Sequence, residues 1–81
     1  MTRDEALERI KKALDTTVGT SADDITEATD LVGDGLLDSL DSMTFLFELE
    51  QDLGTKLEAI DETYEDFRVG AIVDIVVQAT S

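Results

Sequence analysis

Apolar residues recur at helical spacing in the first part of the chain. They lie three, four and four positions apart, on one face of a helix: Leu7, Ile10, Leu14 and Val18. Ahead of them, Thr2 and Glu5 have the spacing of a capping box, in which each side chain accepts a hydrogen bond from the other's backbone N–H. The pattern predicts a first helix that runs to about Asp15, with Gly19 stopping it.

A long polar stretch follows between Gly19 and Leu37. It is rich in Gly, Ser, Thr and Asp, with Ile25 and Leu31 as isolated apolar anchors and Val32 as a third candidate. Loops of this length are unusual inside small domains and tend to carry function. Because neither a repeat nor a Pro-rich linker interrupts the chain, we expect a single domain over residues 1–81.

The strongest helix start lies at Asp38. Asp is a preferred N-cap residue, and Asp41 adds negative charge to the first turn, where the helix dipole favours it. We expect this second helix to run from Ser39 to about Leu53, with Gly54 as its C-cap.

Two apolar stripes run along this second helix. One suits the core: Phe45, Leu46, Leu49 and Leu53. The other has polar residues on both sides: Leu40, Met43 and Phe47. The second stripe either packs against the long loop or the last helix, or stays open, and Phe47 is the better candidate for exposure. An open apolar stripe edged by acids is typical of a docking surface for a partner that is apolar in the middle and basic at the edge.

The rest of the chain carries two shorter apolar patterns. Ile60, Tyr64 and Phe67 predict a short helix opened by Asp61. A last helix is indicated by four apolar residues at helical spacing: Val69, Ile72, Val73 and Val76. The β-branched run over residues 72–77 would also suit a strand, but no other segment offers that strand a partner.

Composition limits the classes of function. Twenty acidic residues against six basic ones give a net charge of −14, which excludes the basic surfaces that bind nucleic acid or anionic lipid. The absence of His and Cys excludes zinc sites, Ser/His and Cys/His dyads and disulfides. No apolar run approaches the ~20 residues that span a bilayer, and the start lacks the pattern of a signal peptide. We therefore expect a cytoplasmic protein that is not inserted in a membrane.

Ser39 occupies the first position of the predicted second helix. Free backbone N–H groups and the helix dipole favour an anion there, such as a phosphate ester on the serine hydroxyl. Serine is also common at helix starts, so the local pattern alone favours an ordinary structural residue. A nucleophilic serine would need a positioned general base, for which a chain without His could offer only Lys or a carboxylate.

The ten residues from Asp34 to Met43, DGLLDSLDSM, resemble the attachment site of the acyl carrier protein family. The family's core is Asp-Ser-Leu with a Gly shortly before it, here Asp38, Ser39 and Leu40. The resemblance extends to the first helix, the long loop, the acidic second helix and the apolar end of the chain. It implies an all-α fold, a four-helix bundle with one short helix and a long first loop.

The resemblance also implies a function. Ser39 would carry 4'-phosphopantetheine, transferred from coenzyme A by a phosphopantetheinyl transferase, and the thiol of that group would hold an acyl cargo as a thioester. The chain would be a stand-alone, monomeric carrier rather than an enzyme, serving enzymes of fatty-acid, polyketide or related biosynthesis with basic docking patches. The positions that match the family's partner-recognition helix include the second stripe: Asp38, Leu40, Asp41, Met43, Phe47 and Glu48.

The chain departs from the usual fatty-acid carriers at two places. Thr44 stands where many have an acid, and residues 57–59 lack the Pro found in that loop. The stretch over residues 35–39 is closer to D-alanyl and other aminoacyl carriers, so the cargo stays open between an acyl and an aminoacyl group.

A calcium-binding module is the alternative from another class. Five residues match positions one, five, six, nine and twelve of an EF-hand loop: Asp30, Asp34, Gly35, Asp38 and Asp41. Val32, however, stands at the third ligand position, and Asp41 replaces the bidentate Glu of that motif. This match is therefore incomplete.

Overall fold

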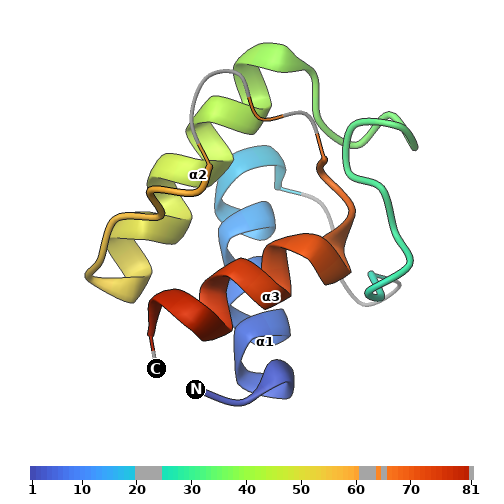
Figure 1. Cartoon of the computed structure of the whole chain (residues 1–81). Coiled ribbons are helices and arrows are strands. Elements are labelled where there is room, and N and C mark those ends of the chain that lie inside the picture. Colours follow the sequence, from blue (N-terminus) through green and yellow to red (C-terminus); the bar gives the residue numbers. More distant parts are fainter. Residues whose placement is uncertain (20–24, 61–63, 65, 81) are drawn as a thin grey trace.

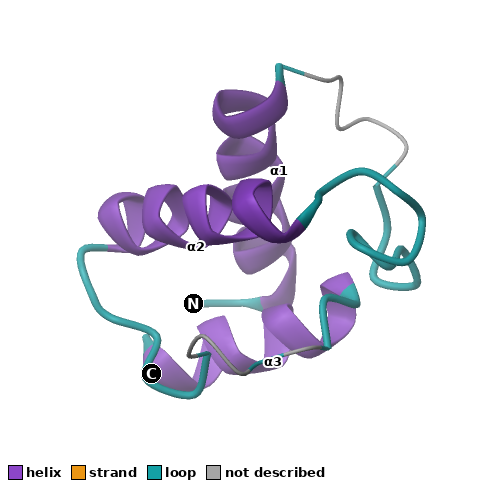
Figure 2. Ribbon diagram, turned by 90° about the horizontal axis from the view of Figure 1, so that it is seen from above, coloured by secondary structure: helices purple, strands orange, loops and turns teal. Residues whose placement is uncertain are grey.

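Three helices and a long loop make up the fold (Figure 1). The computed structural model describes residues 1–19, 25–60, 64 and 66–80. In chain order the helices are α1 (Arg3–Val18), α2 (Ser39–Leu53) and α3 (Val69–Ala79). α1 packs against both of the others, and Figure 2 shows it running crosswise to them. The long loop lies beside the first turns of α2 and α3 (Figure 1).

The core is apolar and draws on all three helices and the segments between them. Phe45 and Leu49 of the predicted core stripe are fully buried, while Leu46 and Leu53 are half-buried against the same cluster. The other large, fully buried side chains come from every part of the chain: Ile10, Leu31, Leu57, Val69, Ile72, Val73 and Val76. Burial of these side chains is the main stabilising contribution to the fold, because each contributes ~1.5–3 kcal/mol by leaving water.

The helix ends follow their capping residues. The capping box between Thr2 and Glu5 is confirmed. α1 continues to Val18, three residues beyond the predicted end, because Gly19 closes it in the left-handed conformation (φ 65°), with its N–H donating to the carbonyl of Asp15 at 2.9 Å.

Both predicted ends of α2 are confirmed, as is the last helix. Asp38 is the N-cap of α2, and Gly54 at φ 69° is its C-cap. The β-branched run near the end of the chain forms α3 because its apolar residues at helical spacing meet the core on one face.

The predicted four-helix bundle is wrong, since the described part of the chain holds three helices. Asp61, the expected start of the short helix, lies outside the described residues. Ile60, Tyr64 and Phe67 are not helical, although Tyr64 and Phe67 still meet edge to face with their rings 5.5 Å apart. These three apolar residues therefore pack on the core without being helical.

Backbone pairing with the long loop explains this difference. The Phe67 carbonyl accepts from the Leu31 N–H at 3.0 Å, and the Val69 N–H donates to the Thr29 carbonyl at 2.8 Å. These bonds hold residues 67–69 beside residues 29–31, with Asp30 and Arg68 paired in an antiparallel bridge, so the chain is extended at this point. The described part of the predicted loop, residues 25–37, contains no helix, as expected. Ile25 and Leu31 are buried there, whereas Val32 is 41% exposed and is not an anchor.

Ion pairs link α1 to its neighbours. Asp52 of α2 accepts from Arg9 at 3.0 Å and from Lys12 at 3.1 Å, and its side chain is only 16% exposed. Arg3 at the start of α1 pairs with both Glu27 in the loop and Asp74 of α3. The hydrogen bonds from Lys12 and Arg9 hold the pKa of Asp52 below its ordinary value.

We expect Asp52→Asn to lower the free energy of unfolding by about 1 kcal/mol at neutral pH, because partly exposed ion pairs contribute about 0.2–1 kcal/mol each. A carboxyl whose pKa is lower in the folded state stabilises the fold above its unfolded pKa of about 3.9. That contribution is lost as the pH falls through the folded pKa. Urea unfolding should therefore separate the variant from the parent protein at neutral pH and not in strong acid.

Glu8→Gln is the matched control, because it removes one negative charge from a carboxylate that is 74% exposed and 3.9 Å from Lys11. Its effect should be close to zero. Equal losses in the two variants, or a difference that persists in acid, would contradict the role given to Asp52.

Candidate functional site

Ser39 lies at the exposed start of α2, and its neighbour forms the cap. The Asp38 carboxylate accepts from the Asp41 N–H at 2.7 Å, and the Asp38 carbonyl accepts from the Ser42 N–H at 2.9 Å. The Ser39 hydroxyl makes no hydrogen bond to another described residue. It is therefore open to solvent, and it does not cap the start of α2.

The start of α2 can also accept an anion. Within the described part of the chain, the N–H groups of Ser39 and Leu40 have no acceptor. Unpaired N–H groups at this end of a helix favour a phosphate group. An exposed hydroxyl beside them fits a phosphodiester on Ser39 without displacing a buried side chain.

A tight loop holds the start of α2 in place. The Leu37 N–H donates to the Leu31 carbonyl at 2.8 Å, and both side chains are buried. Ahead of them, the Gly33 N–H donates to the Asp30 carboxylate at 2.8 Å, and Gly35 turns the chain at φ 79°. Leu37 thus anchors Asp38 and Ser39 to the core, a role that the sequence analysis missed although the adjacent Leu36–Leu37 pair could have indicated it.

The second stripe of α2 is open, and Phe47, the residue for which exposure was most expected, is the least exposed of the three. Leu40, Met43 and Phe47 are 74%, 60% and 58% exposed. Asp38 is also exposed, while Asp41 and Glu48 are partly exposed. The structure therefore places all six predicted partner-binding residues at the surface of one helix and its N-cap.

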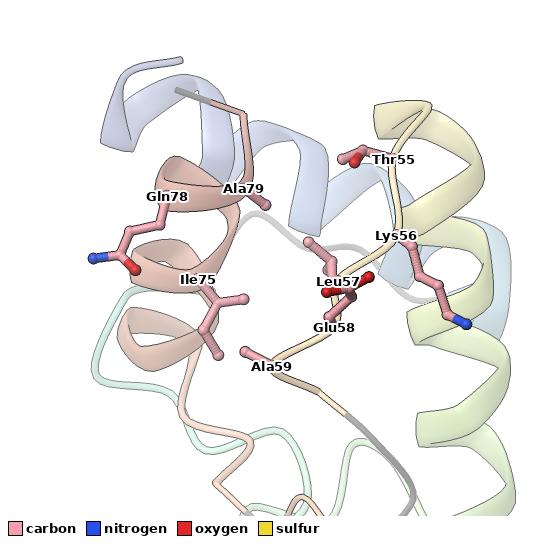
Figure 3. Close-up of a pocket in the computed structure, with 8 residues that line it drawn as sticks. All are labelled: Thr55, Lys56, Leu57, Glu58, Ala59, Ile75, Gln78 and Ala79. Carbon is pink, nitrogen blue, oxygen red and sulfur yellow. The ribbon is translucent and has the colours of Figure 1, made fainter.

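Two open pockets flank the segment that follows α2. One, of about 510 Å³, lies at the end of α2 and is lined by residues of the helix and of this segment: Phe47, Glu50, Gln51, Gly54, Thr55 and Lys56. The other, of about 460 Å³, lies between residues 55–59 and α3 (Figure 3). The Glu50 carboxylate accepts from the Leu57 N–H at 2.7 Å and so ties this segment to α2.

Three aspartates in the loop and at the N-cap of α2 hydrogen-bond to the backbone. Asp30, Asp34 and Asp38 each accept a hydrogen bond from a nearby N–H through the side chain. Across the described residues, no three acidic side chains converge to hold a metal ion. The five residues that matched the EF-hand pattern are therefore not arranged as its ligands.

The comparisons with known proteins give one match. Residues 8–65 match the family model described as phosphopantetheine attachment site, which covers more than half of the chain. A search of curated proteins found no match, and a search of solved structures found none. In the described part of the chain, no helix is long and apolar enough to cross a membrane.

Two substitutions can separate the effect of the N-cap hydrogen bond of Asp38 from the effect of its negative charge. We expect Asp38→Ala to lower the free energy of unfolding by about 1 kcal/mol, the usual effect of losing an N-cap side chain. Asp38→Asn keeps an oxygen that can accept from the Asp41 N–H and should retain most of that stability. Chemical unfolding of the two variants tests this, and equal destabilisation by Asn and Ala would show that the charge, not the hydrogen bond, matters.

Proposed function

Because this chain belongs to the family of phosphopantetheine-carrying carrier proteins, we propose that its attachment residue is Ser39. The observation that supports this assignment is the exposed hydroxyl of Ser39, which makes no hydrogen bond to another described residue and lies beside two free N–H groups at the start of α2. The cofactor of the family is covalently attached 4'-phosphopantetheine. We further propose that residues 1–81 act as one carrier domain.

The chemistry is divided between the chain and its enzymes. When attached, the prosthetic group supplies the thiol that holds cargo as a thioester, which suits a chain without Cys. Ser39 has no hydrogen-bonded base among the described residues, so the transferase must remove the hydroxyl proton. We infer that the carrier catalyses no step, and that its own contribution is to display Ser39 and to bind the enzymes.

The open stripe of α2 is the docking surface that we propose for these enzymes. Apolar anchors usually provide most of the binding energy of an interface, while charges at its edge set the rate and orientation of encounter. Leu40, Met43 and Phe47 supply the anchors, and Asp38, Asp41 and Glu48 supply the edge. A basic patch on the transferase and on biosynthetic enzymes complements this surface.

The cargo has two candidates. We propose an acyl group for fatty-acid, polyketide or related biosynthesis, with an aminoacyl group as the alternative favoured by the sequence of residues 35–39. The net charge of −14 opposes contact between two copies, which supports a monomer. Intact-mass analysis of the protein from its native source, with gentle release of the thioester, would identify the cargo.

Modification should occur once, at Ser39. A phosphopantetheinyl transferase with coenzyme A should add one prosthetic group to the parent protein, and Ser39→Ala should abolish the mass increase. Ser42→Ala is the control, because the Ser42 hydroxyl is buried and donates to the Ser39 carbonyl at 3.0 Å. Labelling that persists in Ser39→Ala would defeat the assignment.

Docking should depend on the open stripe. Met43→Ala and Phe47→Ala should each slow loading by about 5–30-fold at all salt concentrations, the range expected for interface anchors worth 1–2 kcal/mol. Asp41→Asn should slow loading mainly at low salt, since edge charges are screened. The measurement is kcat/KM for loading across a salt series.

Val32→Ala controls for these variants, because Val32 is an exposed apolar residue outside α2. It should load normally, and all the variants should unfold like the parent protein. Normal loading by both Met43→Ala and Phe47→Ala would show that the open stripe is not the docking surface.

A further inference from the structure

Lys56 differs from every other basic residue of the chain. Five basic side chains form ion pairs: Arg3, Arg9, Lys11, Lys12 and Arg68. Within the described part of the chain, Lys56 is exposed and forms none. The acid that lines the same pocket, Glu50, directs its carboxylate to the Leu57 N–H instead. An unpaired cation is thus displayed on a protein whose net charge is −14.

The position of Lys56 connects it to the open stripe. Lys56 lines the pocket at the end of α2 together with Phe47, and Phe47 is also the last residue of the stripe. Figure 3 shows the Lys56 side chain pointing away from Ile75 of α3. The ammonium group therefore continues the surface of α2, with Asp38 and Asp41 at one end of the stripe and a cation beyond the other.

A partner of ordinary size would reach both ends. The 15 residues of α2 span about 22 Å at 1.5 Å per residue. A standard interface covers ~800 Å² on each partner, which corresponds to a patch roughly 30 Å across. An enzyme whose interface is centred on α2 is therefore large enough to cover both Ser39 and Lys56.

We propose that the enzymes of this carrier, the transferase included, place an acidic side chain against Lys56 while their basic patch faces Asp38 and Asp41. This inference rests on the proposed function, since it takes the stripe as the docking surface. The two charged ends make docking directional: a partner bound in reverse would bring its basic patch to Lys56 and its acid to Asp38 and Asp41. Like charges opposed in this way disfavour the wrong orientation. Lys56 thus helps to bring the enzyme's active site to Ser39.

Reversing the charge of Lys56 tests this proposal, because general attraction and a specific acid opposite Lys56 predict different directions of change in the loading rate. Lys56→Glu and Lys11→Glu change the net charge equally, but Lys11 lies on α1 and lines neither pocket. General attraction between an acidic carrier and a basic enzyme predicts that both variants load as fast as the parent protein or faster. A specific acid opposite Lys56 predicts that Lys56→Glu alone loads more slowly.

The probe is a phosphopantetheinyl transferase with coenzyme A, and the readouts are kcat/KM for loading and the affinity of the transferase for carriers that also have Ser39→Ala. We expect Lys56→Glu to lower both about three- to fivefold at low salt, with a smaller effect at high salt. Lys11→Glu should lower neither, and thermal unfolding should show that both variants are folded. Lys56→Glu that loads and binds as well as Lys11→Glu overturns the inference while leaving the proposed function intact. Parent protein that gains no mass at Ser39 overturns the proposed function and the inference together.

Discussion

The hydrogen bond from the Asp41 N–H to the Asp38 carboxylate fixes where α2 begins, and the site depends on that starting point. Because Asp38 caps the helix, the hydroxyl of the next residue, Ser39, is free. Burial of Phe45 and Leu49 in the core sets the rotation of the helix, and it leaves Phe47 facing outward.

Net charge shapes the rest of the molecule around this helix. Nearly all of the basic side chains are used to tie α1 to α2, to α3 or to the loop, or to neutralise a close neighbour. Among the acids of α2, Asp52 pairs with Arg9 and Lys12 of α1. The acids at the edge of the stripe form no ion pair with a described residue. Asp38, Asp41 and Glu48 therefore present unpaired negative charge beside exposed apolar side chains, so the same surface can attract a basic partner and bind it by apolar contact.

Sequence reasoning predicted the parts of the fold that local physics determines. The caps at Thr2, Asp38 and Gly54 and the apolar period of each helix depend on residues within one or two turns, and they were predicted correctly. The short fourth helix was predicted wrongly, because the segment around Phe67 pairs with Leu31, far away in the sequence, and no local pattern signals such pairing. The openness of the stripe and the pairing of Asp52 with Arg9 and Lys12 likewise depend on which elements meet across the fold.

The pairing between the loop and the segment before α3 also bears on the order of folding. It joins residues 29–31 to residues 67–69, so the whole of α2 lies within the chain segment that it closes. Closing this segment costs more entropy than closing the shorter loop between α1 and α2, so contacts between these two helices can form before it. The pairing cannot open without disturbing the core, because the side chains of Leu31, Phe67 and Val69 are all buried. The amide hydrogens of Leu31 and Val69 should then exchange with solvent slowly, and the loop residues that anchor Ser39 should stay in place for as long as the core is intact.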